Sequence, residues 1–244
     1  MPRFFVPTAN FSDNTVKITG DDARHIARSL RMAEGDSVTV CDMQGGEHEC
    51  TLTRIRDEVC ECKITASKKG ENEPPVKITL YMAYPKADKL EYIVQKAVEL
   101  GASEIVPFES ERCIKRPAPE KAEKNTARLQ RIATEAAKQC GRSTLPTVTP
   151  PISFKEALSR AVSADIPIFC YEGDGTRSLR EVLCEAKDTK TVSVTVGCEG
   201  GFSLGEAEAA ANAGFKMVNL GKRILRCETA PSFALSSLIY HFEL

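Results

Sequence analysis

The stretch Val196-Gly-Cys-Glu-Gly-Gly-Phe-Ser203 lies between an apolar segment and a segment with a helix-capping pattern, and the fold can be worked out from it. The apolar segment before it, residues 191–196, predicts a buried strand. Ser203 with Glu206 three residues later forms a capping box, which predicts a helix that ends at Gly214. A strand followed by a glycine-rich turn and a helix indicates an α/β fold with a parallel sheet.

Glycines let backbone N–H groups approach a ligand, and ligands of open α/β sheets bind at the carboxyl ends of strands. The turn at 197–201 is therefore a candidate binding site. Its spacing matches neither G-x-G-x-x-G nor the P-loop, which disfavours a dinucleotide or ATP. The glycines alone leave a second interpretation open, a tight turn that binds nothing.

A second unusual stretch, Leu220-Gly-Lys-Arg-Ile-Leu-Arg-Cys-Glu-Thr-Ala230, follows another short apolar segment. It combines the apolar pair Ile224 and Leu225 with three cations and an acid. Such a loop fits a pocket with apolar and polar walls, with Arg226 and Glu228 beside the apolar pair. A charged surface loop is the alternative.

The chain on either side of these stretches divides into two patterns. Apolar segments predict strands at 77–83, 104–108, 166–171, 191–196 and 216–220. Helical periodicity predicts helices at 88–100, at 122–140, from Ser203 to Gly214, and after Pro231. Residues 1–70 instead predict a small β-barrel, with strands at 15–19, 37–41, 50–55 and 59–64 around one helix at 21–32. The polar stretch 67–75 indicates a linker.

Composition narrows the class of protein. The 244 residues carry a formal net charge of −1, so RNA binding would require an uneven charge distribution. The 10 cysteines include no C-x-x-C and accompany only three histidines, so we expect reduced, mostly buried thiols and no metal site. The N-terminus lacks the apolar core of a signal peptide, and no apolar run reaches the ~20 residues that span a bilayer. We therefore expect a cytoplasmic protein without membrane contact.

The two quoted stretches, in this order, resemble the paired C-terminal motifs of the ribosomal small-subunit RNA methyltransferase E family in the SPOUT superfamily. Further pieces of the chain resemble the family in the same order: Arg3-Phe-Phe-Val6, His25-Ile-Ala-Arg-Ser-Leu-Arg31, the segment from Lys86 to Gly101, and the segment from Glu135 to Pro146. The resemblance covers nearly the whole chain.

This resemblance implies an α/β domain at 77–244 with a deep trefoil knot, a PUA-like RNA-binding β-barrel at 1–70, and a linker at 71–76. Nothing in the periodicity predicts a knot. The resemblance also implies a homodimer that uses S-adenosyl-L-methionine to methylate uracil N3 in 16S ribosomal RNA. The substrate would be either the free RNA or the assembled small ribosomal subunit. The target base that the resemblance implies is uracil 1498.

The resemblance also implies site residues. We expect the cofactor to contact Tyr171, Glu172, Gly197, Gly200, Gly201, Leu220, Gly221, Ile224, Leu225 and Thr229. Arg226 is expected to stabilise the negative charge that develops on uracil. Glu199 and Glu228 are candidate bases, although a carboxylate in such a loop can equally be a hydrogen-bond partner, and water can take the proton.

Two sets of basic side chains recur at helical spacing. Arg24, Arg28 and Arg31 are expected to share one face of the helix at 21–32. A second stripe comprises Lys121, Lys124, Arg128, Arg131, Lys138 and Arg142. The candidate RNA contacts are Arg3, Arg24, Arg28, Arg31, Lys86, Arg112 and Arg142. The alternative for both stripes is a solvated surface with Glu–Lys pairs.

Cys198 and Cys227 depart from the family pattern, which commonly has Pro at the first position and Thr or Ala at the second. Since Pro fixes φ, Cys198 is expected to weaken the pre-organisation of the cofactor loop without abolishing the site. Methylation of nitrogen needs no carbon activation, so we expect Cys227 to be a packed thiol and not a nucleophile. Two alternatives stay open: a ribose 2′-O methyltransferase of the same superfamily, and a non-catalytic RNA-binding assembly factor.

Overall fold

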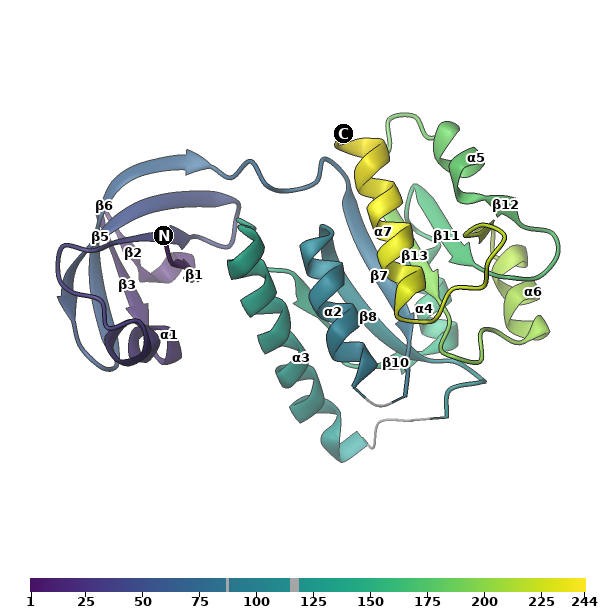
Figure 1. The fold of residues 1–244 in the computed structure, drawn as a ribbon, viewed down its shortest axis with the longest axis horizontal. Helices are drawn as coiled ribbons and strands as arrows, with labels where there is room; N and C mark the ends of the chain where they lie inside the picture. Colours follow the sequence, from purple (N-terminus) through teal and green to yellow (C-terminus); the bar gives the residue numbers. More distant parts are fainter. Residues whose placement is uncertain (87, 115–118) are drawn as a thin grey trace. The chain divides into compact units, whose positions relative to one another are not determined.

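The computed structural model describes residues 1–86, 88–114 and 119–244. The chain forms two compact units, coloured along the sequence in Figure 1. Unit 1 comprises Met1–Glu73 together with Ala137–Leu145. Unit 2 comprises Pro74–Ala136 and Pro146–Leu244. The two units have separate sheets, so each is described by itself.

Unit 1 contains a six-stranded sheet with the order β1-β4-β5-β6-β3-β2, in which only β1 and β4 pair in parallel. Its elements are β1 (Arg3–Phe5), η1 (Thr8–Asn10), β2 (Phe11–Ser12), β3 (Thr15–Thr19), α1 (Asp21–Arg24), η2 (His25–Ser29), β4 (Ser37–Cys41), β5 (Gly46–Ile55) and β6 (Val59–Lys69). Cys60 and Cys62 lie on the same face of β6, because side chains alternate along a strand, and both are buried in the core. The Cys-x-Cys spacing therefore reflects packing.

The strands β5 and β6 are longer than the sequence predicts. We expected β5 to begin at residue 50 and β6 to end at residue 64, with a linker from residue 67. All three expectations are wrong, because Gly46 and Glu47 pair with Lys69 and Lys68 in one antiparallel ladder. The pairing partner, and not the polar composition, decides where these strands end.

The helix predicted at 21–32 is also shorter than expected. Its first turn, α1, is α-helical, the next, η2, is a wider π-helical turn, and Ser29 ends it. Arg31 then adopts a left-handed conformation with φ +50°. Arg31 therefore does not continue the helical face of Arg24 and Arg28, and the predicted three-arginine stripe is wrong.

Four charged side chains in unit 1 form a cluster that we call the buried arginine cluster: Arg3, Glu47, Glu73 and Arg142. The Arg3 Nη1 donates to Glu47 Oε1 at 2.7 Å and to the carbonyl of Arg142 at 3.2 Å. The Arg142 guanidinium donates to Glu73 Oε2 from Nη2 at 2.6 Å and from Nε at 2.9 Å. The cluster joins Ala137–Leu145 to the sheet of unit 1.

Unit 2 is built on an eight-stranded sheet in which every pairing is parallel, as the strand–helix alternation predicted. The strand order is β10-β8-β7-β13-β11-β14-β12, with β9 paired to β8. The strands are β7 (Lys77–Ala83), β8 (Ala102–Glu109), β9 (Thr147–Val148), β10 (Ile152–Ser153), β11 (Ile166–Cys170), β12 (Arg177–Ser178), β13 (Thr191–Val196) and β14 (Lys216–Asn219).

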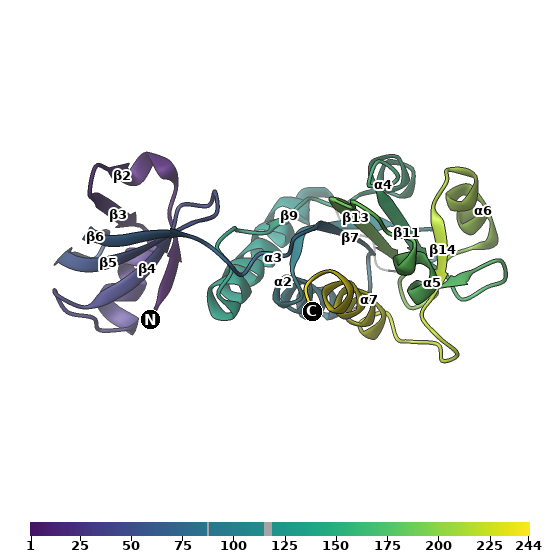
Figure 2. The ribbon, with the colours of Figure 1, turned by 90° about the horizontal axis from the view of Figure 1, so that it is seen from above.

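Helices cover both faces of this sheet. They are α2 (Lys89–Glu99), α3 (Pro119–Cys140), α4 (Phe154–Ala161), α5 (Leu179–Cys184), α6 (Leu204–Asn212) and α7 (Thr229–Phe242). Figure 2 shows α2 and α7 on one face and α4 on the other. The capping box of Ser203 and Glu206 starts α6 as predicted. The short helices α4 and α5 were not predicted.

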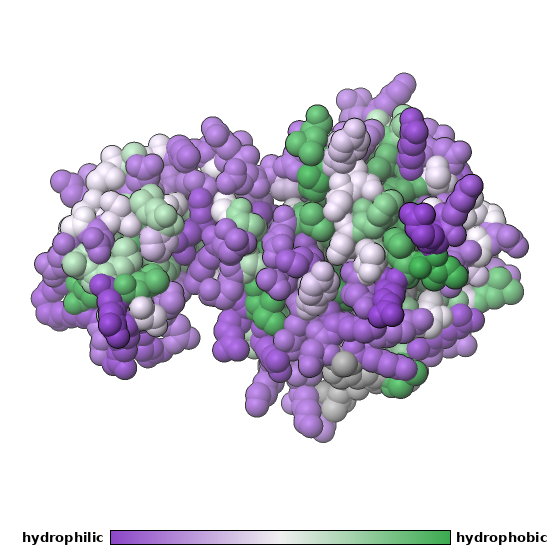
Figure 3. Space-filling view, viewed as in Figure 1, coloured by the Kyte–Doolittle hydropathy of each residue, from purple (hydrophilic) through white to green (hydrophobic). Residues whose placement is uncertain are grey.

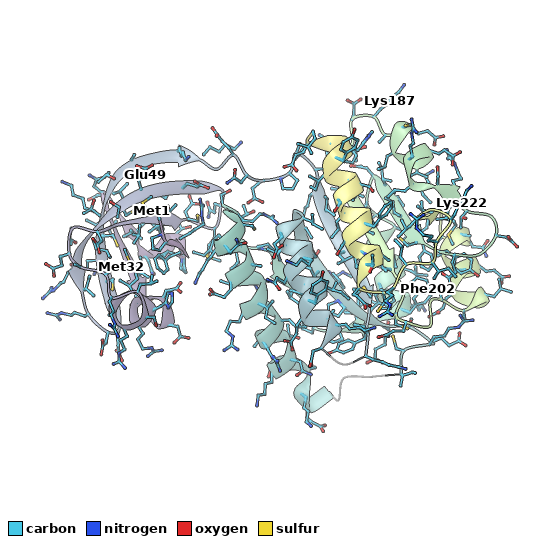
Figure 4. All side chains as sticks on the ribbon, in the orientation of Figure 1. Met1, Met32, Glu49, Lys187, Phe202 and Lys222 are labelled. Carbon is cyan, nitrogen blue, oxygen red and sulfur yellow. The ribbon has the colours of Figure 1, made fainter. Side chains whose placement is uncertain are left out.

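An aromatic cluster lies beneath the turn that follows β13. The fully buried Phe202 packs on Phe169 with ring centroids 4.2 Å apart, and Phe108 lies parallel to it at 6.3 Å. Figure 4 labels Phe202 near the start of α7. Because such rings bury a large apolar area, they fix the backbone of the preceding glycine turn against the sheet.

In residues 1–86, 88–114 and 119–244, no helix combines the length and apolarity needed to cross a bilayer. The same residues contain no group of three or more His, Cys, Asp and Glu side chains placed to hold a metal ion. The described cysteines are free thiols, and most of them are buried.

Candidate functional site

A cavity of about 530 Å³ opens at the carboxyl ends of β11, β13 and β14. The two quoted stretches, which lie apart in the sequence, form its walls together with the end of β11. The predicted cofactor contacts that line it are Tyr171, Glu172, Gly197, Gly200, Gly201, Leu220, Gly221, Ile224 and Leu225. Glu199 and Arg226 also line it. Its volume is in the range of small-molecule sites.

Thr229 is the one predicted cofactor contact that does not line this cavity within the described residues; it is the first residue of α7. Its N–H and that of Ala230 both donate to the carbonyl of Arg226 at 2.9 Å, which closes the first turn of α7. Glu228 does not line the cavity either, but its carboxylate reaches a neighbouring lysine.

The glycine turn after β13, residues 197–201, is tight, and this tightness accounts for its composition. The Gly201 N–H donates to the carbonyl of Cys198 at 3.0 Å, and Gly201 has φ +62°. A Cβ on Gly201 would lie 2.5 Å from Glu172 Oε1, and one on Gly197 would lie 3.1 Å from the backbone of Gly201. The two interpretations left open from the sequence are therefore compatible, because a tight turn here also forms a cavity wall.

The loop after β14, residues 220–228, is more open. Gly221 has φ +105°, which favours glycine, and Lys222, labelled in Figure 4, is exposed. Ile224 lines the cavity but is 86% exposed, so it is not packed against the rest of this chain.

Lys89, which the sequence analysis did not select, links the two loops. Its ammonium lies 3.1 Å from Glu199 Oε1, 3.2 Å from Glu228 Oε2 and 3.8 Å from Cys227 Sγ. It also lines the cavity. The available signal was its position: Lys89 is the first residue of the helix that follows β7, at the ligand-binding edge of a parallel sheet.

These contacts fix the charges at neutral pH. Burial alone would raise the pKa of Glu199, but its own backbone N–H and the Lys89 ammonium outweigh burial and lower the pKa. Burial would likewise raise the pKa of Glu228, but hydrogen bonds from its own backbone, from Cys227 and from Lys89 outweigh burial and lower it. Hydrogen bonds to Glu199 and Glu228 raise the pKa of Lys89 to about 12. The group therefore carries two negative charges and one positive charge.

The two cysteines in the loops are packed thiols. Burial and the hydrogen bond to Glu228 raise the pKa of Cys227 to about 12, so this thiol stays protonated. The hydrogen bond between Cys198 and Cys113 raises the pKa of Cys198 and lowers that of Cys113. Ser110 Oγ lies 3.2 Å from Cys113 Sγ and 3.9 Å from Cys198 Sγ. The thiol of Cys198 thus has polar partners that a proline would lack.

The predicted RNA contacts have different environments. Lys86 and Arg112 border the cavity: the Lys86 N–H donates to Glu199 Oε1 at 3.1 Å, and Arg112 Nη1 donates to the Gly200 carbonyl at 2.9 Å. Arg3 and Arg142 belong to the buried arginine cluster instead, and Arg142 is only 3% exposed. Arg142 also lies beyond the end of α3, so the predicted stripe does not extend to it.

The remaining predicted contacts are on the surface of unit 1. Arg24 forms an ion pair with Asp21, and Arg28 forms one with Asp57. Arg31 is exposed. Of the basic residues predicted on α3, Lys138 pairs with Asp22 at 2.7 Å and Arg128 pairs with Glu91 at 2.9 Å. The solvated or paired interpretation therefore describes most of these side chains.

Comparison with known proteins agrees with this geometry. A family profile described as an RNA methyltransferase domain matches residues 72–239, and one described as an RNA methyltransferase PUA domain matches residues 18–65. The chain is 33% identical over 234 residues to the ribosomal RNA small subunit methyltransferase E of Bacillus subtilis, covering 94% of this chain and 91% of that protein. It is 32% identical to the protein of the same name from Synechocystis, covering 97% and 76%.

A solved structure gives the same result. The ribosomal RNA small subunit methyltransferase E of Neisseria gonorrhoeae, crystallised with S-adenosyl methionine, is 36% identical and superposes with a TM-score of 0.86. The match covers 98% of this chain and 97% of that one. Unit 2 is thus a mixed α/β domain with a parallel sheet, and a PUA-like domain precedes it. The chain belongs to the RNA methyltransferase family whose members include the ribosomal RNA small subunit methyltransferases E.

Proposed function

We propose that this chain transfers a methyl group from S-adenosyl-L-methionine to N3 of a uracil in 16S ribosomal RNA, with uracil 1498 as the target. The observation that carries the proposal is the single cavity formed by both family loops at the carboxyl edge of the parallel sheet. The relative from Neisseria gonorrhoeae, which binds this cofactor, supports it at 36% identity.

The residues of the cavity fit the cofactor. Gly197 and Gly201 leave room that a Cβ would fill, and the walls combine backbone groups with apolar and acidic side chains. The cofactor would be held by the residues predicted from the sequence that line the cavity, from Tyr171 and Glu172 to Leu225. Bound there, it supplies an electrophilic methyl group. The ionised acids Glu199 and Glu228 and the ammonium of Lys89 give the adjoining group a net charge of −1, which suits a sulfonium cation.

The chain's own residues then have separate tasks. The exposed guanidinium of Arg226, at the cavity wall, is proposed to stabilise negative charge on the uracil carbonyls as N3 loses its proton. Glu199 and Glu228 are ionised and able to accept a proton, but their lowered pKa values make them weak bases. Water therefore remains an alternative acceptor. Holding the base and the methyl donor in one cavity supplies much of the acceleration.

We further propose a homodimer. Exposed apolar side chains gather on one side of unit 2, and Figure 3 shows apolar groups over α7 and near the loop beside it. They are Tyr92 on α2, Ile224 in the loop, and Phe233, Tyr240 and Leu244 in or after α7. A second copy would cover these residues and complete the wall at Ile224.

The trefoil knot remains part of the proposal. It is supported by the placement of β13 between β7 and β11, together with α7 packing back against α2 and β13 after the long 220–228 loop. For RNA, we propose that Lys86 and Arg112 at the cavity and Arg31 on unit 1 contact phosphates. The ribosomal RNA substrate implies a cytoplasmic location.

The decisive experiment compares nucleosides of ribosomal RNA from strains with and without this protein by mass spectrometry. We expect 3-methyluridine to disappear and to return on complementation. Loss of a 2′-O-methyl nucleoside instead would favour the ribose methyltransferase. An unchanged nucleoside profile, together with no calorimetric binding of S-adenosyl-L-methionine, would favour the non-catalytic assembly factor.

A further inference from the structure

Lys89 contacts both cofactor loops from a third, rigid element. It begins α2, whose Leu90, Ile93 and Val94 are buried against the sheet and against α7. In the two cofactor loops, residues 197–201 and 220–228, most side chains are at least partly exposed, for example those of Glu199 and Ile224. Helix α2 can therefore fix the position of the ammonium, and the ammonium can fix the loops.

The two acids that meet Lys89 come from different loops. Glu199 lies in the turn after β13, and Glu228 closes the loop after β14. The Lys86 N–H, just before α2, adds a second hydrogen bond to Glu199 at 3.1 Å. The neutral thiol of Cys227 donates to Glu228 at 3.2 Å. Apart from Lys89 and Glu199, the charged side chains that line the cavity are Glu172, Lys222, Arg223 and Arg226.

We propose that Lys89 is a positioning residue that clamps the two cofactor loops into one pocket and keeps both of their carboxylates charged. This inference rests on the proposed function, since it assigns the clamp to the cofactor pocket. Two carboxylates that share one ammonium attract it and repel each other. Without the ammonium, one acid must take up a proton or the loops must separate.

The clamp has a further electrostatic consequence. Lys89, Glu199 and Glu228 together carry a net charge of −1. Without the lysine, the two acids would carry a net charge of −2 at high pH, or −1 once one of them is protonated. Loop separation would then depend on pH, being greater at high pH where both acids are ionised. A residue with a purely structural role in α2 would produce no such pH dependence.

The test uses Lys89→Met, which keeps the apolar stem of the side chain and removes the charge. The matched control is Lys96→Met on the same helix. Lys96 pairs with Glu99 and has the same side-chain exposure as Lys89, 33%, but lies outside the pocket. Lys89→Arg is the rescue variant, because a guanidinium can also bridge two carboxylates.

Two readouts are measured. Hydrogen exchange of the ligand-free protein should rise at 197–201 and 220–228 in Lys89→Met and stay unchanged in Lys96→Met. Calorimetry with S-adenosyl-L-methionine should show affinity about tenfold weaker for Lys89→Met at pH 8, less so at pH 5, and largely recovered in Lys89→Arg. The wild type should show little change between the two pH values.

The outcomes separate this inference from the proposed function. Unchanged exchange in both loops, or Lys89→Met affinity equal to that of the wild type at pH 8, would overturn the clamp. Increased exchange in both loops would support the clamp even if the wild-type chain proved to methylate a different nucleoside. If circular dichroism shows that Lys89→Met is unfolded, Lys89→Gln in the same two measurements decides the matter.

Discussion

The buried arginine cluster of unit 1 and the lysine clamp of unit 2 are built alike but differ in their surroundings. In each, a cation joins segments that are distant in the sequence to acidic partners. The Arg142 side chain is 4% exposed, whereas that of Lys89 is 33% exposed and borders a cavity. A cation without access to solvent holds a fold together, and one at a cavity wall can also act on a ligand.

This difference explains which sequence predictions were misplaced. Arg142 was predicted as an RNA contact because it continues a basic stripe at helical spacing, and Arg3 was added to that set. The planar fork of an arginine also suits a buried carboxylate, which is the partner that both side chains have in the structure. Lys89 has a positional signal at the start of the helix after β7, but it belongs to no motif that would single it out. Burial and partners, which the sequence does not display, decided both cases.

The largest expected effect is on the stability of unit 1. Arg142→Met removes a buried cation and leaves Glu73 without its main partner, so we expect the free energy of unfolding to fall by about 3–5 kcal/mol. Urea denaturation measures it. The exposed pair of Arg128 and Glu91 supplies the control, since Arg128→Met should cost less than about 1 kcal/mol. Equal losses for the two variants would remove the distinction between buried and exposed pairs.

The next effect concerns catalysis in unit 2. Arg226→Ala should lower kcat by about a hundredfold, because it removes a charge that acts on the developing anion, while the calorimetric affinity for S-adenosyl-L-methionine changes little. Arg180→Ala, on the surface of α5, is the control and should leave kcat unchanged. A normal kcat for Arg226→Ala would exclude that side chain from the mechanism.

A third prediction concerns the pH dependence of the buried arginine cluster. Burial by itself would raise the pKa of Glu73, but hydrogen bonds from Arg142 and Thr144 outweigh burial and lower it. A carboxyl with a depressed folded pKa contributes stability above its unfolded pKa, and the contribution is lost as pH falls through the folded value. Stability should therefore decline below the ordinary value of 4.5. Glu73→Gln should flatten this decline in acid titrations followed by circular dichroism, and an equally steep decline would contradict the assignment.

The smallest effect is expected on RNA binding by unit 1. Arg28 is already paired with Asp57, so Arg28→Ala should hardly change the slope of log affinity against log salt. Arg31 is exposed, and among the described residues no ion pair involves it, so Arg31→Ala should reduce that slope by about 1. Filter binding at several salt concentrations measures both. A larger change for Arg28→Ala would show that its ion pair opens on RNA.

The accuracy of the sequence predictions varied with the kind of feature. Strands β7 and β13 were predicted with the bounds that the structure has, because both are largely buried and rich in apolar and β-branched residues. Helices α4 and α5 were missed, since helices of 8 and 6 residues offer too short a window for periodicity. The capping box of Ser178 and Glu181 was a signal for α5 that was present in the sequence and unused.

The sequence by itself determined the alternation of strands and helices in unit 2, the barrel-like pattern of unit 1, and the two loops whose motifs identify the family. These are local features, fixed by the order of side chains along a few residues. Only the tertiary structure decided which charges are buried, paired or at a cavity. Arg142 and Glu73 are 69 residues apart and Lys89 and Cys227 are 138 apart, and electrostatic energy depends on distance and desolvation, which chain order does not encode.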